Sequence, residues 1–567
     1  MALSHFKIGK EILVHSLTVP FATFLVFAGA VCAFAGECLG SDLVAQIRDR
    51  RMRWGERAEA DKPVLFSRIV RPNRIVRIEH DEDAFQKCRV TPAGSVSDVL
   101  RRDIGYGGCK SFIVDFGEHL VGYPVFRIGE GHQPADSPVK LRLVFAELPA
   151  EIARSAQPLK KGLSPSWIPE EMVFFDEVPA VRELPRRQAF RYVQVTVEST
   201  CSFVLEDISV RAVTSADERK LQVWSSSDAQ LVRMDAVAAR TLRDCMQTMF
   251  EDGPKRDRRL WIGDLRIQAL ANYATYRNFD LVRRCLYLFA CTADEEGLVS
   301  SDVYERPKPR RGSCHILDYT ALFPAIVLEY LEASDDRETA EDLWPLCRRQ
   351  FDFVMKTVGE DGLFRDDGKW WCFIDWNDKL DRQAAEQGVI VYGVERLRRL
   401  ALRLGHENEV ADLVSKAARM KSAARQRLWD ESKGVFVSGP NRQVSQIAQA
   451  WLVLAGIAEE ETARRCLRAT LADSAAERPK TPYACHYLAE ALLVAGLPAE
   501  AENLLKSYWG GMVSAGADTF WEAYDPTDDE VSPYGDVRFN SACHAWSCGP
   551  TYLLRSAGRL SVKGEMR

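Results

Sequence analysis

Between residues 64 and 214, apolar and polar positions alternate along the chain with a period of two. The alternation is clearest at residues 111–116, 139–145 and 192–197, where β-branched and aromatic residues predominate. Short runs of this kind, separated by Gly, Pro and Asp turns, are typical of antiparallel strands with one buried face. The pattern therefore predicts an antiparallel β-sandwich domain over residues 64–215.

From about residue 220 onward, the apolar positions recur every 3.6 residues instead. The pattern predicts twelve amphipathic helices, near residues 228–247, 264–276, 279–292, 316–333, 339–358, 381–404, 407–429, 443–457, 460–473, 483–496, 498–509 and 541–558. Twelve consecutive helices fit an (α/α)6 toroid, in which six inner helices surround a central cleft. A helical repeat array would also give many hairpins, but these segments share no fixed-period consensus. We therefore expect a multi-domain protein, with the β-sandwich followed by an (α/α)6 domain over residues 216–567.

The first 40 residues have a different character from the rest of the chain. Lys7 and Lys10 precede an almost uncharged run over residues 12–35, which ends in the small-x-small sequence Ala-Phe-Ala. This pattern favours a signal peptide over residues 1–35 and hence a secreted or periplasmic protein. The alternative is an uncleaved membrane anchor, because the run is long enough to cross a bilayer about 30 Å thick. Residues 36–63 are then expected to form a linker.

The chain has 567 residues, of which 46% are hydrophobic and 28% charged. These proportions are typical of globular proteins and exclude a disordered, collagenous or coiled-coil chain. The net charge of −6 gives no reason to expect nucleic acid as a partner. The thirteen Trp residues are more than a core of this size usually needs. They indicate either core packing or a cleft lined with aromatic rings.

The fifteen cysteines leave the redox state open. Fourteen remain if Cys32 is removed with the leader, and an even number in an exported protein is compatible with disulfides. However, several cysteines lie inside predicted helices, where buried free thiols are ordinary; these are Cys245, Cys285, Cys291, Cys347 and Cys466. No CxxC pair occurs, so we expect no zinc site.

Three connections between the predicted helices combine acidic residues with tryptophan. They cover residues 250–264, 366–378 and 516–525, and a Cys-His-Ala-Trp-Ser segment follows the last at 543–547. In a single loop, helix capping by Asp and burial of Trp explain such a composition equally well. Three such loops, all at connections of a predicted toroid, favour a sugar-binding cleft.

Glycoside hydrolysis needs this mixture of side chains. Two carboxyl groups must flank the scissile bond, one carrying a proton and one ionised. Aromatic faces pack against the apolar face of a pyranose, while Asp, Arg and His bind its hydroxyls. Burial of one carboxyl against Trp raises its pKa and suits it to act as an acid.

The segment at 252–264, Asp-Gly-Pro-Lys-Arg-Asp-Arg-Arg-Leu-Trp-Ile-Gly-Asp, resembles the signature of glycoside hydrolase family 78, the α-L-rhamnosidases. That signature runs Asp-Cys-Pro-x-Arg-Glu-x-x-Gly-Trp-x-Gly-Asp. The resemblance extends through 373–376, 380–388, 519–522 and 543–547, and it includes Asp-Phe-Gly at 115–117 and Val-Gly-Tyr at 121–123 in the β domain. It thus covers most of the chain after the leader, in the family's order. It implies an inverting exo-glycosidase that releases a terminal α-L-rhamnosyl or similar deoxysugar residue.

The resemblance also implies roles for individual residues. Glu522 matches the general base that activates water, and Asp257 stands where the family has its general acid, a Glu. The sugar in the −1 subsite would be bound by Asp252, Arg256, Trp261, Asp264, Trp376 and His544. The sequence gives no sign of a metal site or cofactor, so a glycoside is the only partner expected. Membrane contact would arise only from an uncleaved leader.

Three positions depart from the family signature. Besides Asp257, Gly253 replaces a Cys and Leu260 replaces a Gly. Asp257 is one methylene shorter than Glu, so a neighbouring acid such as Glu251 is an alternative proton donor. One alternative function is hydrolysis of another sugar such as an unsaturated uronide, for which Arg256, Arg258 and Arg259 would supply a basic pocket. The other is a catalytically silent carbohydrate-binding relative, which the shortened acid would favour.

Overall fold

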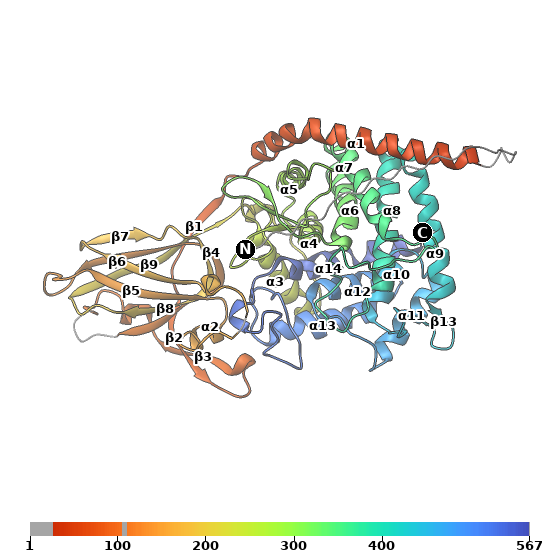
Figure 1. The fold of residues 1–567 in the computed structure, drawn as a ribbon. Coiled ribbons are helices and arrows are strands. Elements are labelled where there is room, and N and C mark those ends of the chain that lie inside the picture. Colours follow the sequence, from red (N-terminus) through yellow and green to blue (C-terminus); the bar gives the residue numbers. More distant parts are fainter. Residues whose placement is uncertain (1–25, 105–109, 161, 566–567) are drawn as a thin grey trace, which may run out of the picture.

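The computed structural model describes residues 26–104, 110–160 and 162–565. It has an antiparallel sheet domain at one end and a larger helical domain at the other (Figure 1). Residues 1–25, which hold most of the expected signal peptide, lie outside the described residues, so the leader stays a prediction. Within the described residues, no helix is both long and apolar enough to cross a membrane. The twelve cysteines whose side chains are described are all free thiols.

The described strands of the first domain form one nine-stranded antiparallel sheet. Its long strand β4 (Ser111–Glu130) changes partners midway. The first half of β4 pairs with β2 and β8, whereas the second half pairs with β7 and β9. The other strands are β1 (Phe66–Val70), β2 (Arg74–His80), β3 (Cys88–Gly94), β5 (Val139–Ala146), β6 (Glu170–Phe175), β7 (Ala180–Glu183), β8 (Gln188–Val197) and β9 (Phe203–Thr214). Alternate side chains of these strands form one apolar cluster. The period of two therefore reflects one apolar face per strand over most of the sheet, whereas Val76, Val144, Ala146 and Tyr192 form a second, smaller apolar cluster with Ile152.

Each of the twelve predicted helices has a counterpart in the helical domain. They are α3 (Ala229–Cys245), α4 (Ile262–Ala274), α5 (Phe279–Cys291), α6 (Leu317–Ser334), α7 (Arg337–Val354), α8 (Gln383–Leu404), α9 (Ala411–Arg427), α10 (Gln446–Leu454), α11 (Glu460–Ala472), α12 (Pro482–Val494), α13 (Pro498–Ser514) and α14 (Gly549–Glu565). The largest difference is at α14, which begins eight residues later than residue 541. Residues 541–548 form a loop and a short 3₁₀ turn (Ala545–Cys548) instead.

The even-numbered helices pack against one another in a closed ring. Helix α4 contacts α6, α6 contacts α8, and the series continues through α10 and α12 to α14, which contacts α4 again. Helices such as α6, α10 and α12 are buried on nearly every side. The odd-numbered helices α5, α7 and α11 have one buried face and one polar face, as expected for an outer layer.

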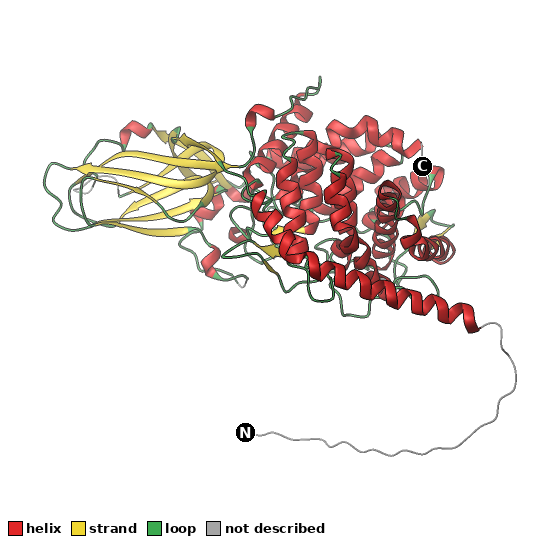
Figure 2. Ribbon diagram, turned by 90° about the horizontal axis from the view of Figure 1, so that it is seen from above, coloured by secondary structure: helices red, strands yellow, loops and turns green. Residues whose placement is uncertain are grey.

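Residues 36–63, expected to be a linker, are helical up to residue 60. They belong to helix α1 (Val26–Ala60), which lies along the outside of the helical domain (Figure 2) and contacts α5 and α7. Leu43, Ile47, Trp54 and Ala58 are buried in this contact. This segment is therefore packed against the domain that follows the sheet rather than connecting elements loosely.

Two short strands of the helical domain are attached to the strand that precedes α4. Strand β10 (Leu260–Trp261) pairs with β11 (Asp302–Tyr304), and β11 pairs with β12 (Arg310–Arg311). We call this three-stranded unit the β10–β12 ribbon. It joins the connection before α4 to the connection before α6. A separate pair, β13 (Trp429–Asp430) and β14 (Val435–Phe436), lies before α10.

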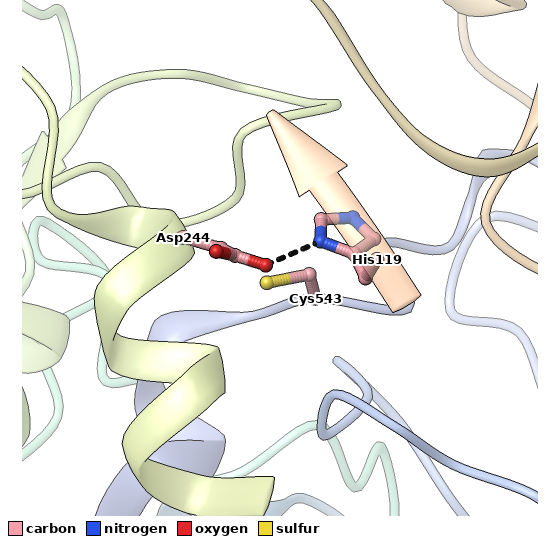
Figure 3. A group of neighbouring side chains, drawn as sticks. All are labelled: His119, Asp244 and Cys543. Atoms are coloured by element: carbon pink, nitrogen blue, oxygen red, sulfur yellow. Dashed lines mark hydrogen bonds and ion pairs between the residues drawn. The ribbon is translucent and has the colours of Figure 1, made fainter. Parts of the chain in front are cut away.

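Buried charges connect the sheet domain to the helical domain. His119 on β4 binds Asp244 of α3 through Nδ1 at 2.7 Å (Figure 3). Its Nε2 binds Glu147 at 3.1 Å. Glu147 also accepts a hydrogen bond from the Ala542 amide at 2.5 Å and lies 3.4 Å from the ammonium of Lys255. Burial lowers the pKa of His119, but Cys543, Asp244 and Glu147 outweigh it and raise that pKa well above its usual range. We call these groups the junction network.

His119, Asp244 and Cys543 could together approach a cation, since their ligand atoms all lie within 4.8 Å of one another. The hydrogen bond of His119 to Asp244 and the ion pair of Asp244 with Arg243 at 2.7 Å already use their polar atoms. Cys543 Sγ in turn lies 3.8 Å from the Thr241 carbonyl oxygen. These contacts account for the three residues as part of the junction network.

Candidate active site

The three loops with acids and tryptophan each lead into a helix of the inner ring. Residues 246–261 precede α4, residues 355–382 precede α8, and residues 515–548 precede α14. Because inner and outer helices alternate along the chain, these connections meet at the same end of the ring. The first and third are held together by backbone hydrogen bonds, such as that from the Ala545 amide to the Asp252 carbonyl at 2.7 Å.

Arg256 lies at the centre of the site. Its Nη2 donates to both oxygens of Glu522 at 2.7 and 2.8 Å, and its Nη1 donates to Asp257 Oδ1 at 2.9 Å. Its Nε donates to the Phe539 carbonyl at 2.9 Å, and its guanidinium carbon lies 4.1 Å from the centre of the Tyr534 ring. One buried cation therefore bridges the two carboxyls to which the family resemblance gives the roles of acid and base.

Glu522 is buried and receives several further donors. The Tyr534 hydroxyl donates to its Oε1 at 2.6 Å, and the Ser541 amide donates to its Oε2 at 2.8 Å. Burial opposes ionisation of this carboxyl, but the charge of Arg256 and these hydrogen bonds outweigh it and lower the pKa of Glu522 below its usual range. Glu522 is thus held as a carboxylate, the form that a base requires.

Asp252 and Asp264 are also buried, but their pKa values are raised, in contrast to that of Glu522. Asp252 accepts hydrogen bonds from the Asp257 and Arg259 amides at 3.3 and 3.0 Å. Burial and the neighbouring charge of Asp257 nevertheless raise the pKa of Asp252 to about 8. Burial and the charges of Asp252 and Glu522 also raise the pKa of Asp264 well above its usual range. Asp264 is the third residue of α4 rather than its N-cap, so capping does not explain it.

His544 connects these carboxyls. Its Nε2 lies 3.6 Å from Glu522 Oε1, and its Nδ1 lies 3.5 Å from Asp264 Oδ1. Burial lowers the pKa of His544 to about 4 despite the nearby Glu522. Within the described part of the chain, neither His544 Nδ1 nor Asp264 Oδ1 has a hydrogen-bond partner. These two buried atoms are available to a polar ligand, because unpaired buried polar groups are costly.

Aromatic rings form one wall beside these groups. The Trp376 ring lies 5.0 Å from Trp546 and 5.7 Å from Tyr534, in edge-to-face geometry. Phe373 stacks on Trp546 at 5.9 Å, and His544 lies 4.4 Å from Trp546. Trp261 is half-buried at the start of α4. The structure therefore brings these rings of three separate loops to the same end of the ring.

Not every tryptophan of the three loops belongs to this wall. Trp521 is buried and stacks on Phe85 of the sheet domain at 4.5 Å, which is a packing role at the domain junction. Trp371 is 45% exposed and lies against Phe373. Trp370 contacts His315. The tryptophans of these loops thus serve either the aromatic wall or packing, and others, such as Trp451 and Trp509, are buried in the core of the helical domain.

Glu251, the alternative proton donor, is held in an ion pair with the sheet domain. Arg187 of the sheet domain binds both its oxygens at 2.9 and 2.6 Å. Arg258 is also occupied, because it donates to the carbonyls of Pro254 and Arg187. Arg259 lies between Asp302 at 3.4 Å and Asp257 at 3.9 Å. The arginines proposed for a basic pocket are therefore paired or bound to backbone.

Sequence reasoning missed Tyr534 and Asp302. Tyr534 lies twelve residues beyond Glu522 in an irregular segment, where no periodicity marks it. Asp302 is buried on β11, directly opposite Trp261, and burial together with Asp257 raises its pKa to about 6 although Arg259 opposes this. Only the pairing of β10 with β11 brings Asp302 to the site, and no local pattern predicts that pairing.

Two family models match the chain. The glycosyl hydrolase family 78 alpha-rhamnosidase N-terminal domain matches residues 72–212, and the bacterial alpha-L-rhamnosidase 6 hairpin glycosidase domain matches residues 219–557. The second model alone covers more than half of the chain. The chain belongs to the α-L-rhamnosidases of glycoside hydrolase family 78. It is therefore a glycoside hydrolase.

Solved structures of α-L-rhamnosidases resemble it as well. A rhamnosidase from Klebsiella oxytoca, solved with rhamnose bound, is 40% identical, with 89% of this chain and 98% of that chain covered and a TM-score of 0.86. The family 78 rhamnosidase of Bacillus sp. GL1 is 24% identical, with 78% and 46% covered and a TM-score of 0.67. A Streptomyces avermitilis α-L-rhamnosidase complexed with L-rhamnose is 16% identical, with 82% and 46% covered and a TM-score of 0.61. The last two show similarity of fold alone. No curated protein sequence matches the chain.

Two departures from the family 78 signature have a physical reason in the structure. A Cβ atom on Gly253 would lie 2.4 Å from the Arg256 carbonyl oxygen, so the loop closes too tightly here for the Cys of the family pattern. Leu260, which replaces a Gly, is fully buried opposite Val303 in the β10–β12 ribbon. Both changes fit this rhamnosidase's own packing around the loop. Asp257 remains the one departure among the residues matched to the catalytic pair.

Proposed function

We propose that the protein removes terminal α-L-rhamnosyl residues from a glycoside by a single displacement with inversion at the anomeric carbon. The observation that carries the proposal is the bridge of Arg256 between the Glu522 and Asp257 carboxyls. Only the two C–N bonds of the guanidinium separate its terminal nitrogens, so the contacting carboxylate oxygens lie at most about 8 Å apart. This limit admits the roughly 6.5–9.5 Å between the carboxyls of inverting glycosidases as well as the roughly 5–5.5 Å of retaining ones, so the anomeric form of the first product decides between the two mechanisms.

In this mechanism Asp257 gives its proton to the glycosidic oxygen as the bond to the anomeric carbon breaks. Glu522 takes a proton from water, whose oxygen attacks that carbon from the opposite face. The products are free rhamnose of the opposite anomeric form and the leaving alcohol. Asp257 ends ionised and Glu522 protonated, and exchange with solvent restores both groups.

The remaining site residues would bind the sugar. We propose that His544 and Asp264 use their unpaired atoms for hydroxyl groups, with Asp252 and Arg256 beside them. Trp261 and Trp376 would pack against the apolar face of the ring. We infer that the closed ring of even-numbered helices is the (α/α)6 toroid and that the sheet domain is the β-sandwich of this family. We propose exo action because the groups that would bind the sugar, such as Asp252, Asp264 and His544, are buried.

The test is hydrolysis of two α-L-rhamnosides with different leaving groups. In one the leaving group is para-nitrophenol, and in the other it is a hydroxyl group of a second sugar. Proton NMR should detect β-rhamnose first in both reactions. Glu522→Gln should lower kcat by about 10²–10⁴-fold on both substrates, because both need the base. Asp257→Asn should lower kcat strongly for the sugar leaving group and much less for para-nitrophenol, which departs without a proton.

Asp367→Asn is the matched control, because Asp367 is exposed and binds only its neighbour Lys369 among the described residues. It should keep the wild-type rate on both substrates. Circular dichroism should show that every variant is folded. Wild-type turnover in Glu522→Gln, or α-rhamnose as the first product, would overturn the proposed mechanism.

A further inference from the structure

One face of the β10–β12 ribbon extends outward from the active site. Trp261 lies opposite Asp302 across the first strand pair, and Tyr304 lies opposite Arg310 across the second. Side chains alternate between the two faces of a strand, so Asp302 and Tyr304 share a face. Opposite residues of an antiparallel pair also share a face, which places Trp261 and Arg310 on it too. Arg310 therefore lies on the same face as the tryptophan matched to the −1 subsite, two strands away.

The contact with the Tyr304 ring determines the position of the Arg310 guanidinium. The guanidinium carbons of Arg259 and Arg310 lie 4.3 and 4.0 Å from the centre of the Tyr304 ring. They are therefore separated by no more than the sum of these two distances. Arg259 itself lies 3.9 Å from Asp257 Oδ2. A continuous series of contacts thus leads from Asp257 through Arg259 and Tyr304 to Arg310.

The positive charges along this series differ in whether a nearby carboxylate neutralises them. Arg256 is balanced by Glu522 and Asp257, and Arg259 by Asp302. In contrast, Arg310 is exposed and forms no ion pair within 4.0 Å among the described residues, although its charge partly offsets the raised pKa of Asp302. The adjacent Arg311 lies on the other face of the ribbon, where Asp294 pairs with it at 3.2 Å. The ribbon thus presents a surplus of positive charge on the site's side, in a protein whose net charge is −6.

The role of Asp257 determines which part of a substrate this surplus would meet. An acid that protonates the glycosidic oxygen lies beside the leaving group, so the groups that continue outward from Asp257 line the leaving-group side. We infer that the β10–β12 ribbon forms a subsite for a leaving group that carries an anion, with Arg310 as its principal contact and Tyr304 as the ring that holds the Arg310 guanidinium in place. This inference rests on the proposed function, because Asp257 sets the direction.

The shared chemistry of the expected ligand is a single negative charge on a sugar, either the carboxylate of a uronic acid or a sulfate ester. Both accept two hydrogen bonds from a guanidinium. This places an anion in the position next to the rhamnosyl unit. In the alternative function suggested by the sequence, hydrolysis of an unsaturated uronide, the anion would instead belong to the sugar that is released. The arginines near that position are already paired or bound to backbone.

The experiment compares kcat/KM for three rhamnosyl disaccharides of the same linkage. Their leaving groups are glucuronate, glucose, and glucose with a sulfate on its primary hydroxyl. We expect the wild-type protein to prefer at least one anionic leaving group over glucose by about tenfold, and we expect this preference to shrink as salt is added. A larger effect for glucuronate or for the sulfate identifies the source of the anion. Equal values for all three would overturn the inference.

Arg310→Gln should reduce the ratio of anionic to neutral kcat/KM at least fivefold, whereas Arg310→Lys should keep most of it. Arg311→Gln is the matched control, since Arg311 is the next residue and lies on the opposite face. It should leave the ratio unchanged. An equal loss on charged and neutral leaving groups in Arg310→Gln would contradict an anion contact and indicate a structural role.

A binding measurement separates failure of this inference from failure of the proposed function. Calorimetric titration of glucuronate in the presence of L-rhamnose should show binding to the wild-type protein, weakened at least fivefold in Arg310→Gln. This readout needs no hydrolysis. Cleavage of para-nitrophenyl rhamnoside without any anion preference or glucuronate binding would reject the subsite alone. Glucuronate binding without cleavage of any rhamnoside would reject the proposed function alone.

Discussion

Arg256 shows what the sequence can and cannot reveal about a single residue. Its position in the segment at 252–264 identified it as a candidate. The contact with Glu522 spans 266 positions along the chain and depends on two loops meeting at one end of the ring. No local pattern contains that information. Residue types at the site were therefore predictable from motifs, whereas the pairing of Asp257 with Glu522 through one guanidinium was not.

Asp252 has a cost for stability that can be measured. Its pKa in the folded protein is about 8, against 3.8 for an unperturbed Asp. Between these values the folded state holds a proton that the unfolded state has released. The contribution of Asp252 to the free energy of unfolding therefore falls as the pH rises from 3.8 to about 8. Asp252→Asn removes this titration, so the variant should melt a few degrees above the wild type at pH 8 and closer to it at pH 4.

The same substitution should lower kcat/KM at least tenfold, because we propose Asp252 as a sugar contact. Differential scanning calorimetry at several pH values measures the change in melting temperature. Rhamnoside hydrolysis measures the change in kcat/KM. Asp335→Asn is the control, since Asp335 is 96% exposed and far from the site. It should change neither. A melting difference that does not vary with pH would show that ionisation of Asp252 is not its cause.

At the scale of elements, periodicity predicted the helices well and failed where tertiary contacts use the backbone. Residues 541–548 have a helical pattern but do not form a helix. Their amides donate instead to distant groups: Ser541 to Glu522, Ala542 to Glu147, His544 to the Phe520 carbonyl and Ala545 to the Asp252 carbonyl. A helix beginning at residue 541 would pair the Ala545 amide with the Ser541 carbonyl, but that carbonyl accepts from the Glu522 amide at 2.9 Å instead. The site therefore gains a rigid loop where local propensity favours a helix.

The β10–β12 ribbon was missed for a related reason. Its strands have two or three residues each, which is too short for alternation to be detected. They form only because loops before α4 and α6 lie side by side. Elements with many residues of one period are thus readable in the sequence, and elements defined by non-local pairing are not.

Helix α1 is an example of an element whose contribution can be tested alone. Trp54 on α1 is fully buried, and its Nε1 donates to Asp342 of α7 at 2.9 Å. Trp54→Ala should lower the free energy of unfolding by about 3–5 kcal/mol, because it leaves a large cavity. Rhamnosidase kcat/KM at 25 °C should stay within about twofold, since α1 contacts the outer helices α5 and α7.

Thermal and chemical unfolding measure this effect. Met52→Ala is the control on the same helix, because the Met52 side chain is 79% exposed. It should alter stability by less than about 0.5 kcal/mol, as is usual for surface positions. If Trp54→Ala were as stable as Met52→Ala, α1 would not be an integral part of the helical domain.

At the scale of the whole molecule, the sheet domain contributes to the site without lining it. Glu147 follows β5, yet it binds the Ala542 amide next to Ser541, whose own amide holds Glu522. Lys255 lies in the loop that carries Arg256 and Asp257, and its ammonium binds Glu151 at 2.9 Å and lies 3.4 Å from Glu147. Both loops of the catalytic pair are thus tied to the sheet domain by buried charges.

This arrangement predicts that a residue of the sheet domain affects the rate of a reaction in the helical domain. Glu147→Gln removes the charge that faces both Lys255 and His119. Leaving a buried charge without any partner costs about 3–5 kcal/mol. The cost should be smaller here, because Lys255 keeps Glu151 and His119 keeps Asp244. We expect a lower melting temperature and a lower kcat with a nearly unchanged KM, since Glu522 would lose its fixed position while the sugar contacts remain.

A double-mutant cycle with Lys255→Met tests whether the effect passes through the junction network. The double variant should be less destabilised than the sum of the single variants, since neither charge is then left alone, and the coupling should exceed about 0.5 kcal/mol. Glu79→Gln, at an exposed position of β2, should change neither stability nor rate. Additive effects with wild-type kcat in Glu147→Gln would mean that the sheet domain only packs beside the catalytic loops. Coupled effects with reduced kcat would mean that two domains, which the sequence separates cleanly by hydrophobic period, act as one catalytic unit.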